Sequence, residues 1–236
     1  MKNQFNILLL LTLMLVIGSC SKEDNNMYSI VNTPNLRVSP IDIDTPVDPF
    51  TPVTIGSQVW MKFNLNVDKY RNGDVIPQVQ NGAQWAALTT GAWCYYENNT
   101  ANGPVYGKLY NWYAVNDPRG LAPQGYHVPS DAEWTTLVTF LGGQSVAGGK
   151  MKARTSLWAY PNTNATNSSG FTGLPGGERA NNGSFNVIGD SGIWWSSSEQ
   201  YLTTNAWYRY LYKYDGGVGR DKFNKYTGFS VRCLKD

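Results

Sequence analysis

Histidine, cysteine and charged residues are all scarce in this chain. Its 236 residues include one histidine and three cysteines, and charged residues make up only 15%. The chain therefore has too few histidines and cysteines for a site built from several of them, and we expect no cofactor and no metal. Lysine and arginine number 19 against 17 acids and are scattered among them. We expect no nucleic-acid partner, because such a partner needs a basic face.

Glycine and aromatic side chains are abundant instead. The chain contains 24 glycines, 15 tyrosines and 9 tryptophans. This mixture is typical of a β-rich extracellular domain with many turns and aromatic contacts, rather than of long solvated helices. The length suits one domain of ordinary size, and no period of about 20 to 50 residues indicates a solenoid or a propeller.

The one long apolar run opens the chain, in MKNQFNILLLLTLMLVIGSC. A lysine, an apolar run and then small residues are the layout of a secretory leader, here residues 1–19, and the run is too short for a mature membrane span. Its end, IGSC, resembles the bacterial lipobox, in which the cysteine after the cleavage point receives acyl chains. Cys20 is therefore expected to anchor the protein to a membrane, because several acyl chains give stable attachment.

The residues after Cys20 favour a particular membrane. Ser21 is not the aspartate that typically retains such lipoproteins in the inner membrane. The following Lys22-Glu23-Asp24 resembles the acidic export tag of some Gram-negative surface lipoproteins. We therefore expect an outer-membrane lipoprotein that faces outward.

A change of composition near residue 53 divides the mature chain. Residues 20–52 are rich in Ser, Asn, Asp and Pro, which predicts an extended, flexible tether. From Val53 the sequence VTIGSQVWMKFNLN alternates apolar residues around a glycine, which predicts a strand, a turn and a second strand. Residues 53–236 are expected to form one folded domain, with Trp60 and Leu65 in its core.

The stretch GYHVPSDAEW contains the only histidine and two acids, and its spacing predicts a helix start. Ser130 and Glu133 form a capping-box pattern. The residues at helical spacing on the apolar face are Trp134, Leu137, Val138 and Leu141, and Gly142-Gly143 ends the helix. Asp131 and Glu133 are two residues apart and point in different directions, so they are not a catalytic pair. For His127, a structural role is favoured over a chemical one.

Eight blocks occur in the order found in the Fibrobacter succinogenes major paralogous domain, which the chain resembles over residues 53–236. They are TIGSQVWMKFNLNV, NGDVIP, YGKLYNWYAV, GYHVPSDAEW, FTGLPGG, WWSSSE, AWYRYL and GFSVRCLKD. That domain is similar to the formylglycine-generating-enzyme branch of the C-type lectin-like fold. The resemblance implies an α+β fold with two helices, a twisted and mostly antiparallel sheet, long loops and termini close together.

The same resemblance argues against inherited chemistry. The oxidase branch uses two nearby cysteines that hold copper, whereas this domain has only Cys94 and Cys233, far apart in sequence. The Ca²⁺-dependent sugar motifs of true C-type lectins are absent from the sequence. We therefore expect a protein that is not an enzyme. In an oxidising compartment Cys94 and Cys233 either form a disulfide or remain two buried free thiols, and both alternatives stay open.

The segment NAWYRYLYKYDGG carries the candidate ligand-binding residues. On a strand Tyr208, Tyr210, Tyr212 and Tyr214 fall on one face, and the other face has Trp207 and Leu211 as core contacts. Tyrosines suit a recognition surface, although they also serve to cover the next layer of a fold. Trp194 and Trp195 point to opposite faces of a strand, so at least one belongs to the core. Trp195 and Tyr226 complete the candidate set.

These observations favour a non-catalytic surface lipoprotein that binds an extracellular glycan or protein. An alternative from another class is a structural or assembly component of the cell envelope. A further version of the binding hypothesis is a variable protein diversified by a retroelement, since such proteins use the same lectin-like fold. A degenerate enzyme of the oxidase fold is disfavoured by the missing cysteine pair and the lone histidine.

Overall fold

The computed structural model describes residues 51–201 and 204–236. The expected leader of residues 1–19, the expected lipid anchor at Cys20 and residues 20–50 of the expected tether lie outside the described residues. In the part that is described, no helix combines the length and the apolar character needed to cross a membrane.

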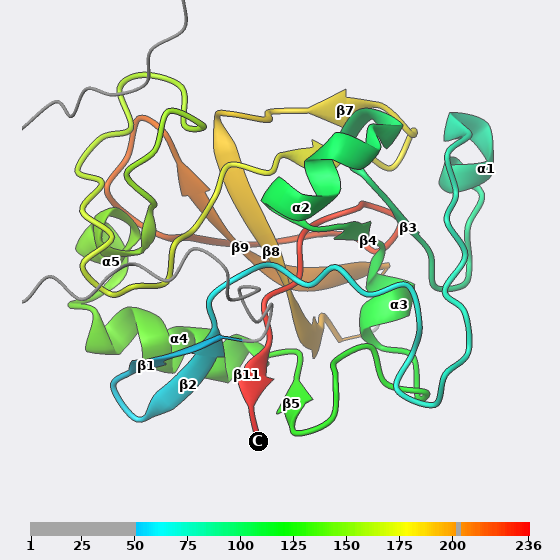
Figure 1. Cartoon of the computed structure of the whole chain (residues 1–236), viewed down its shortest axis with the longest axis horizontal. Helices are drawn as coiled ribbons and strands as arrows, with labels where there is room; N and C mark the ends of the chain where they lie inside the picture. The colour runs from blue at the N-terminus through cyan, green and yellow to red at the C-terminus, as the bar shows by residue number, and fades with distance from the viewer. Residues whose placement is uncertain (1–50, 202–203) are drawn as a thin grey trace, which may run out of the picture. The chain divides into compact units, whose positions relative to one another are not determined.

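Helices and short strands are interspersed up to α5, and the rest of the domain, from β6 to β11, contains strands and loops (Figure 1). In chain order they are β1 (Pro52–Ile55), β2 (Gln58–Met61), α1 (Gly82–Ala86), β3 (Trp93–Cys94), the 3-10 helices η1 (Tyr96–Asn98) and η2 (Thr100–Asn102), α2 (Gly103–Tyr106), β4 (Leu109–Tyr110), α3 (Trp112–Val115), β5 (Tyr126–His127), α4 (Asp131–Phe140), α5 (Gln144–Met151), β6 (Glu178–Arg179), β7 (Phe185–Asn186), β8 (Ser191–Glu199), β9 (Asn205–Tyr212), β10 (Gly219–Asn224) and β11 (Leu234–Lys235).

The strands form several antiparallel sheets, which makes the domain α+β. One sheet has the order β1-β2-β11-β5, a second has the order β10-β9-β8, and β3-β4 and β6-β7 are two-stranded ribbons. The first and last strands lie in the same sheet, which brings the two ends of the domain together. The expected single twisted sheet is thus divided, because turn-rich segments limit many strands to two residues.

Helix α4 has the predicted start and the predicted buried face. The Ser130 hydroxyl accepts from the amide of Glu133 at 3.3 Å, and the Glu133 carboxylate accepts from the amide of Ser130 at 2.7 Å. Trp134 and Leu137 are fully buried, and the Trp134 ring lies 4.8 Å from that of Trp60. The capping box and the apolar spacing therefore do locate this helix.

The three-stranded sheet separates two hydrophobic clusters. Trp194 of β8 packs with α4 in one cluster, and its neighbour Trp195 packs with Trp112 of α3 in the other. Figure 1 shows α4 and α5 on one side of this sheet and α3 with β4 on the other. Both tryptophans are core residues, because side chains alternate across a strand and both faces are covered.

Three buried cations hold the loops through backbone carbonyl groups. Arg232 donates to the carbonyls of Met61, Lys62 and Phe171. Arg179 donates to three other carbonyls, and Lys152 to three more. Within residues 51–201 and 204–236 none of the three cations forms an ion pair with a carboxylate. Loops leave carbonyls that no strand or helix satisfies, and these cations supply the missing donors.

Cys94 and Cys233 are free, buried thiols, so the disulfide considered above is not formed. Cys94 packs with Trp85 and Leu109, whereas Cys233 belongs to a different cluster around Tyr110. Burial raises the pKa of Cys94 to about 11 and that of Cys233 to about 12. Both thiols are therefore protonated and shielded at neutral pH.

The two thiols are expected to resist alkylation in the folded protein. Iodoacetamide attacks the thiolate, which burial suppresses at both positions. Mass spectrometry of residues 51–236 should detect no label after treatment at pH 7.5, and two labels after the same treatment in guanidinium chloride. Rapid labelling without denaturant, or an intact mass that already corresponds to a disulfide, would contradict the structure.

Candidate ligand-binding site

The tyrosine-rich strand β9 alternates as expected, but both of its faces are partly covered. Its pairing places Tyr208 opposite Trp195 and Tyr210 opposite Ile193. Tyr208 and Tyr210 are half-buried against the cluster that contains Trp195. On the other face Arg209 and Leu211 are buried, as expected for Leu211.

Trp207 was expected in the core and is instead only half-buried. The Arg220 guanidinium lies 3.7 Å from the centre of its ring and covers it. Trp207 lies on the same face of β9 as Arg209 and Leu211, but its ring is covered by an arginine from β10 instead of by core residues.

Trp195 is not available to a ligand, which corrects its place in the candidate set. Its side chain is 0% exposed, and its ring lies 4.4 Å from that of Phe229. Its indole nitrogen donates to the Tyr110 carbonyl at 2.9 Å. The residue faces the side of β8 that α3 covers, and it therefore acts as a core residue.

The five candidate tyrosines do not form one patch. Tyr226 packs edge-on against Tyr113 of α3, with 5.6 Å between ring centres, and does not line the cleft described next. Tyr212 and Tyr214 pack edge to face with 5.3 Å between ring centres, and they are 38% and 58% exposed. The accessible tyrosine surface therefore lies where β9 ends.

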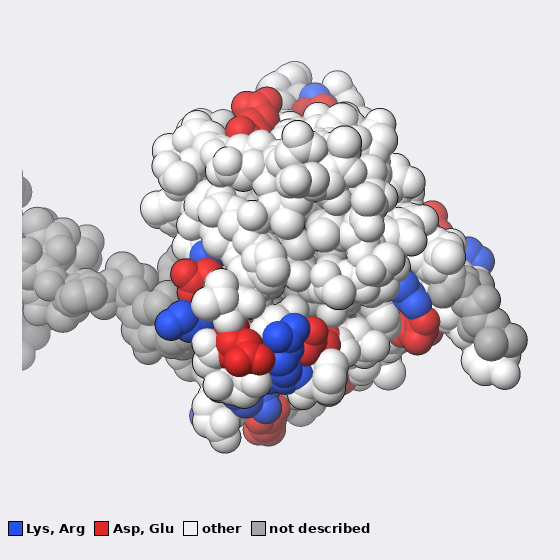
Figure 2. All heavy atoms as spheres, turned by 90° about the vertical axis from the view of Figure 1, so that its right-hand side faces the viewer, with Lys and Arg blue, Asp and Glu red and all other residues white. Residues whose placement is uncertain are grey.

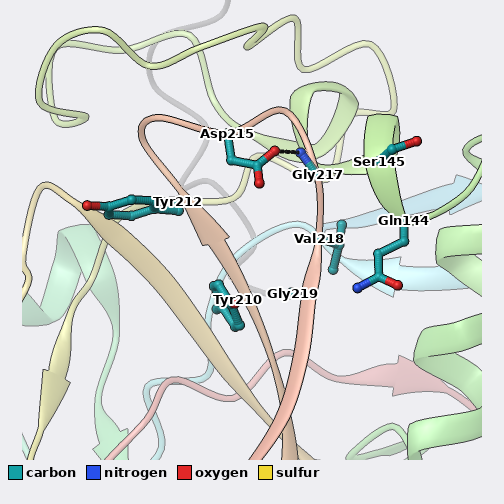
Figure 3. A pocket seen from close by; sticks show the side chains of 8 residues that line it. All are labelled: Gln144, Ser145, Tyr210, Tyr212, Asp215, Gly217, Val218 and Gly219. Atoms are coloured by element: carbon teal, nitrogen blue, oxygen red, sulfur yellow. Dashed lines mark hydrogen bonds between the residues drawn. The ribbon is translucent and has the colours of Figure 1, made fainter.

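A cleft of about 410 Å³ opens beside this end of β9 (Figure 3). We call it the tyrosine cleft; it is lined by Gln144, Ser145, Tyr210, Tyr212, Asp215, Gly217, Val218 and Gly219. The two tyrosine rings come from β9 on one side, and Gln144 and Ser145 come from the first turn of α5 on the other. Aromatic surface, an amide and a carboxylate thus line one concave site.

Glycines make the shape of this cleft possible. Gly219 pairs with Tyr210 across the sheet, and a Cβ at Gly219 would lie 2.0 Å from the Tyr210 ring. The ring therefore lies flat over the glycine backbone. Helix α5 approaches the β9–β10 turn just as closely, because a Cβ at Gly148 would lie 1.7 Å from the Gly217 carbonyl oxygen.

Lys152 holds the turn that carries Asp215. Its ammonium group donates to the carbonyls of Tyr212 at 3.0 Å, Asp215 at 2.6 Å and Thr163 at 2.8 Å. Burial lowers the pKa of Lys152 to about 8, against the opposing charge of Asp215. The Asp215 carboxylate also accepts from the amide of Gly217 at 2.6 Å, so the cleft has a fixed wall.

The lone histidine lies at a different place and is fully engaged. Its Nδ1 lies 2.8 Å from Asp236 and its Nε2 lies 2.9 Å from Glu133. Burial alone would lower the pKa of His127, but the hydrogen bonds to both carboxylates outweigh it and raise the pKa above its ordinary value. The carboxylates bind opposite ring nitrogens and do not converge on one point as metal ligands do. His127 ties the C-terminal strand to the start of α4.

Charge is sparse on the surface as well. On the face shown in Figure 2, charged side chains are few and occur in groups that contain both signs. This face therefore presents no large patch of a single charge.

The fold and the cleft define the class: an α+β domain of short antiparallel sheets joined by long loops, with an aromatic cleft at a strand end. The family model described as the Fibrobacter succinogenes major domain matches residues 53–235, and the chain belongs to this family. This match confirms the family indicated by the ordered sequence blocks. No match was found among curated proteins or among solved structures.

Proposed function

We propose that this protein is a non-catalytic binding module that takes an extracellular glycan in the tyrosine cleft. The cleft itself is the observation that carries the proposal. Its volume of about 410 Å³ falls in the range of small-ligand sites, and it is concave, which suits a few sugar residues better than a flat protein surface.

The lining of the cleft has the chemistry that a sugar needs. A sugar ring presents C–H groups that pack on an aromatic face, and Tyr212 offers such a face at the rim. The same ring presents hydroxyls, for which the Gln144 amide and the Asp215 carboxylate provide partners. The glycines and Lys152 fix these groups before a ligand arrives, which lowers the entropy cost of binding.

The proposal includes a C-type lectin-like topology and a cell-surface location. Two features support the topology: α4 and α5 are the only helices of eight or more residues in the described part, and the first and last strands share a sheet. The leader of residues 1–19 and the lipid anchor at Cys20 support attachment to the outer membrane. At the cell surface the domain then meets glycans directly.

Tyr212→Ala is expected to weaken glycan binding by about tenfold or more, because it removes the exposed aromatic wall of the cleft. A glycan array probed with the full-length chain in a mild non-ionic detergent identifies the ligand, and titration of both proteins measures the affinity ratio. Tyr201→Ala is the matched control, since Tyr201 is 84% exposed and lies in the β8–β9 loop, at the opposite end of β9 from Tyr212.

Two results would overturn the proposed site. The first is an absence of saccharide binding across the array by the intact protein. The second is binding that Tyr212→Ala leaves unchanged, or that Tyr201→Ala weakens equally, while circular dichroism confirms that both variants are folded. Either result would favour the alternative function, a structural or assembly role in the cell envelope.

A further inference from the structure

A second cavity continues the tyrosine cleft along α4. It has a volume of about 190 Å³ and shares Gln144 and Val218 with the cleft. Its other lining residues include Thr135 and Thr139 of α4, together with Arg209 of β9 and Arg220 of β10. The two cavities therefore lie side by side; together we call them the groove, which has tyrosines at one end and Arg209 and Arg220 at the other.

The arginine end holds two cations for one acid. The Asp131 carboxylate binds Arg209 at 2.5 Å and Arg220 at 2.8 Å. The side chain of Arg209 is buried, and it also donates to the Asp131 carbonyl and to the Thr135 hydroxyl. Asp131 therefore compensates the buried charge of Arg209, and the charge of Arg220 remains in excess.

Arg220 is held in place and still has donor capacity. Its Nε and Nη2 bind the Asp131 carboxylate, and its guanidinium packs on the Trp207 ring at 3.7 Å. Its side chain is 43% exposed, and its Nη1 donates to no partner within residues 51–201 and 204–236. A guanidinium whose plane is fixed and whose outer nitrogen is open is suited to bind an anionic group.

A count of the charged groups in and next to the whole groove also gives an excess of one positive charge. Arg209, Arg220 and Lys152 contribute three positive charges, and Asp131 and Asp215 contribute two negative ones, which gives a net charge of one positive. At the tyrosine end the buried Lys152 donates to the backbone carbonyl of Asp215, and its charge opposes that of the Asp215 carboxylate without an ion pair. The uncompensated charge therefore lies at the Arg220 end.

We propose that the groove selects an acidic saccharide, with a sugar ring on the tyrosines and a carboxylate or sulfate group at Arg220. This inference rests on the proposed function and narrows its ligand class. Carboxylate and sulfate share the anionic oxygens that a guanidinium binds. Neutral sugars use the tyrosine end alone and bind more weakly.

The test measures the affinity of the full-length chain, in a mild non-ionic detergent, for three oligosaccharides of equal length. They are oligogalacturonate with carboxylates, a chondroitin sulfate oligosaccharide with sulfates, and a neutral cello-oligosaccharide. We expect at least one acidic oligomer to bind about tenfold more tightly than the neutral one. The more tightly bound acidic oligomer shows which anionic group Arg220 receives.

Arg220→Gln is expected to weaken binding of the acidic oligomer about tenfold and to leave the neutral one unchanged. Lys69→Gln changes the net charge equally at an exposed lysine outside the groove, and it should leave both affinities unchanged. In the Arg220→Gln variant the ion pair between Arg209 and Asp131 remains, so the variant should fold. Thermal unfolding checks this.

Failure of the inference differs from failure of the proposed function. Equal affinity for acidic and neutral oligomers, with both affinities lowered by Tyr212→Ala, would keep the glycan site and reject acid selection. Acid selection would also be rejected if Arg220→Gln weakened binding of acidic and neutral oligomers equally. The same holds if Lys69→Gln weakened binding of the acidic oligomer as much as Arg220→Gln does. Absence of binding to every saccharide would reject the proposed function itself.

Discussion

Replacement of Arg232 with methionine is expected to destabilise the domain by about 3 to 5 kcal/mol. The Arg232 side chain is buried, and its guanidinium donates to the carbonyls of Met61, Lys62 and Phe171 and to the side-chain amide of Asn64. Burial lowers the pKa of Arg232 to about 9, which still leaves the group charged at neutral pH. Its hydrogen bonds are therefore charge-assisted.

The size of the effect follows from the acceptors that remain after the substitution. Methionine fills much of the volume but donates no hydrogen bond, so three carbonyls lose a donor inside the protein, whereas Asn64 Oδ1 keeps the hydrogen bond from the Trp194 indole. Each buried acceptor without a partner costs about 1 to 3 kcal/mol, and the desolvation cost that the guanidinium no longer incurs offsets part of the sum. The net loss is a large fraction of the stability of an ordinary domain.

Guanidinium chloride unfolding, followed by tryptophan fluorescence, measures this loss. Arg154→Met is the matched control, because Arg154 is exposed, and it should change the free energy of unfolding by less than about 0.5 kcal/mol. If Arg232→Met lowers the free energy of unfolding by less than about 1 kcal/mol, water must hydrogen-bond the carbonyls in place of the guanidinium. The stabilising role given to the buried cations is then wrong.

Features encoded by neighbouring residues could be predicted from the sequence. The cap at Ser130 and Glu133 and the apolar face of α4 are complete within a dozen residues, and each part supports the same helix. The β1–β2 hairpin and the alternation of Trp194 and Trp195 are equally local. Local hydrogen bonding and side-chain periodicity set these features whatever the distant contacts are.

The tyrosine cleft and the arginine end of the groove are formed by contacts between distant residues, which sequence spacing does not reveal. Asp131 was interpreted as a helix-start acid, but it also binds arginines from β9 and β10. Lys152 joins carbonyls from two separate segments of the chain, one at Thr163 and one at the end of β9. The paired glycines were a usable signal: Gly148-Gly149 has the composition of a turn, yet it lies inside α5, where it permits backbone contact with the Gly216-Gly217 turn.

Trp195 and Tyr226 illustrate the limit of residue type as a guide. Aromatic side chains serve the core and the surface equally well, and only tertiary packing separates the two uses. The sheet is covered on both faces, which places Trp195 inside, and α3 supplies a partner ring for Tyr226. Tyr212 and Tyr214 are both exposed: Tyr212 is the last residue of β9, and Tyr214 lies in the turn that follows.

Gly148→Ala is expected to destabilise the domain by about 2 to 3 kcal/mol and to weaken glycan binding by about tenfold or more. Helix propensity alone predicts the opposite sign, since alanine is favoured over glycine inside a helix by about 1 kcal/mol. Close packing reverses the sign: the new Cβ would lie 1.7 Å from the Gly217 carbonyl oxygen and 2.5 Å from its carbon. Backbone atoms cannot rotate away as a flexible side chain can, so the turn must move.

That movement affects the cleft directly, because Gly217 and Val218 line it and the neighbouring amide of Gly149 donates to the Gly216 carbonyl at 2.7 Å. Urea unfolding and saccharide titration of the same protein separate the two effects. Gly82→Ala is the matched control: Gly82 begins helix α1, a Cβ there meets nothing closer than 3.7 Å, and the change should be neutral or slightly stabilising. If Gly148→Ala is as stable as the parent and binds glycan equally well, α5 cannot pack against the turn as described. If it is destabilised but binds normally, the turn does not shape the site.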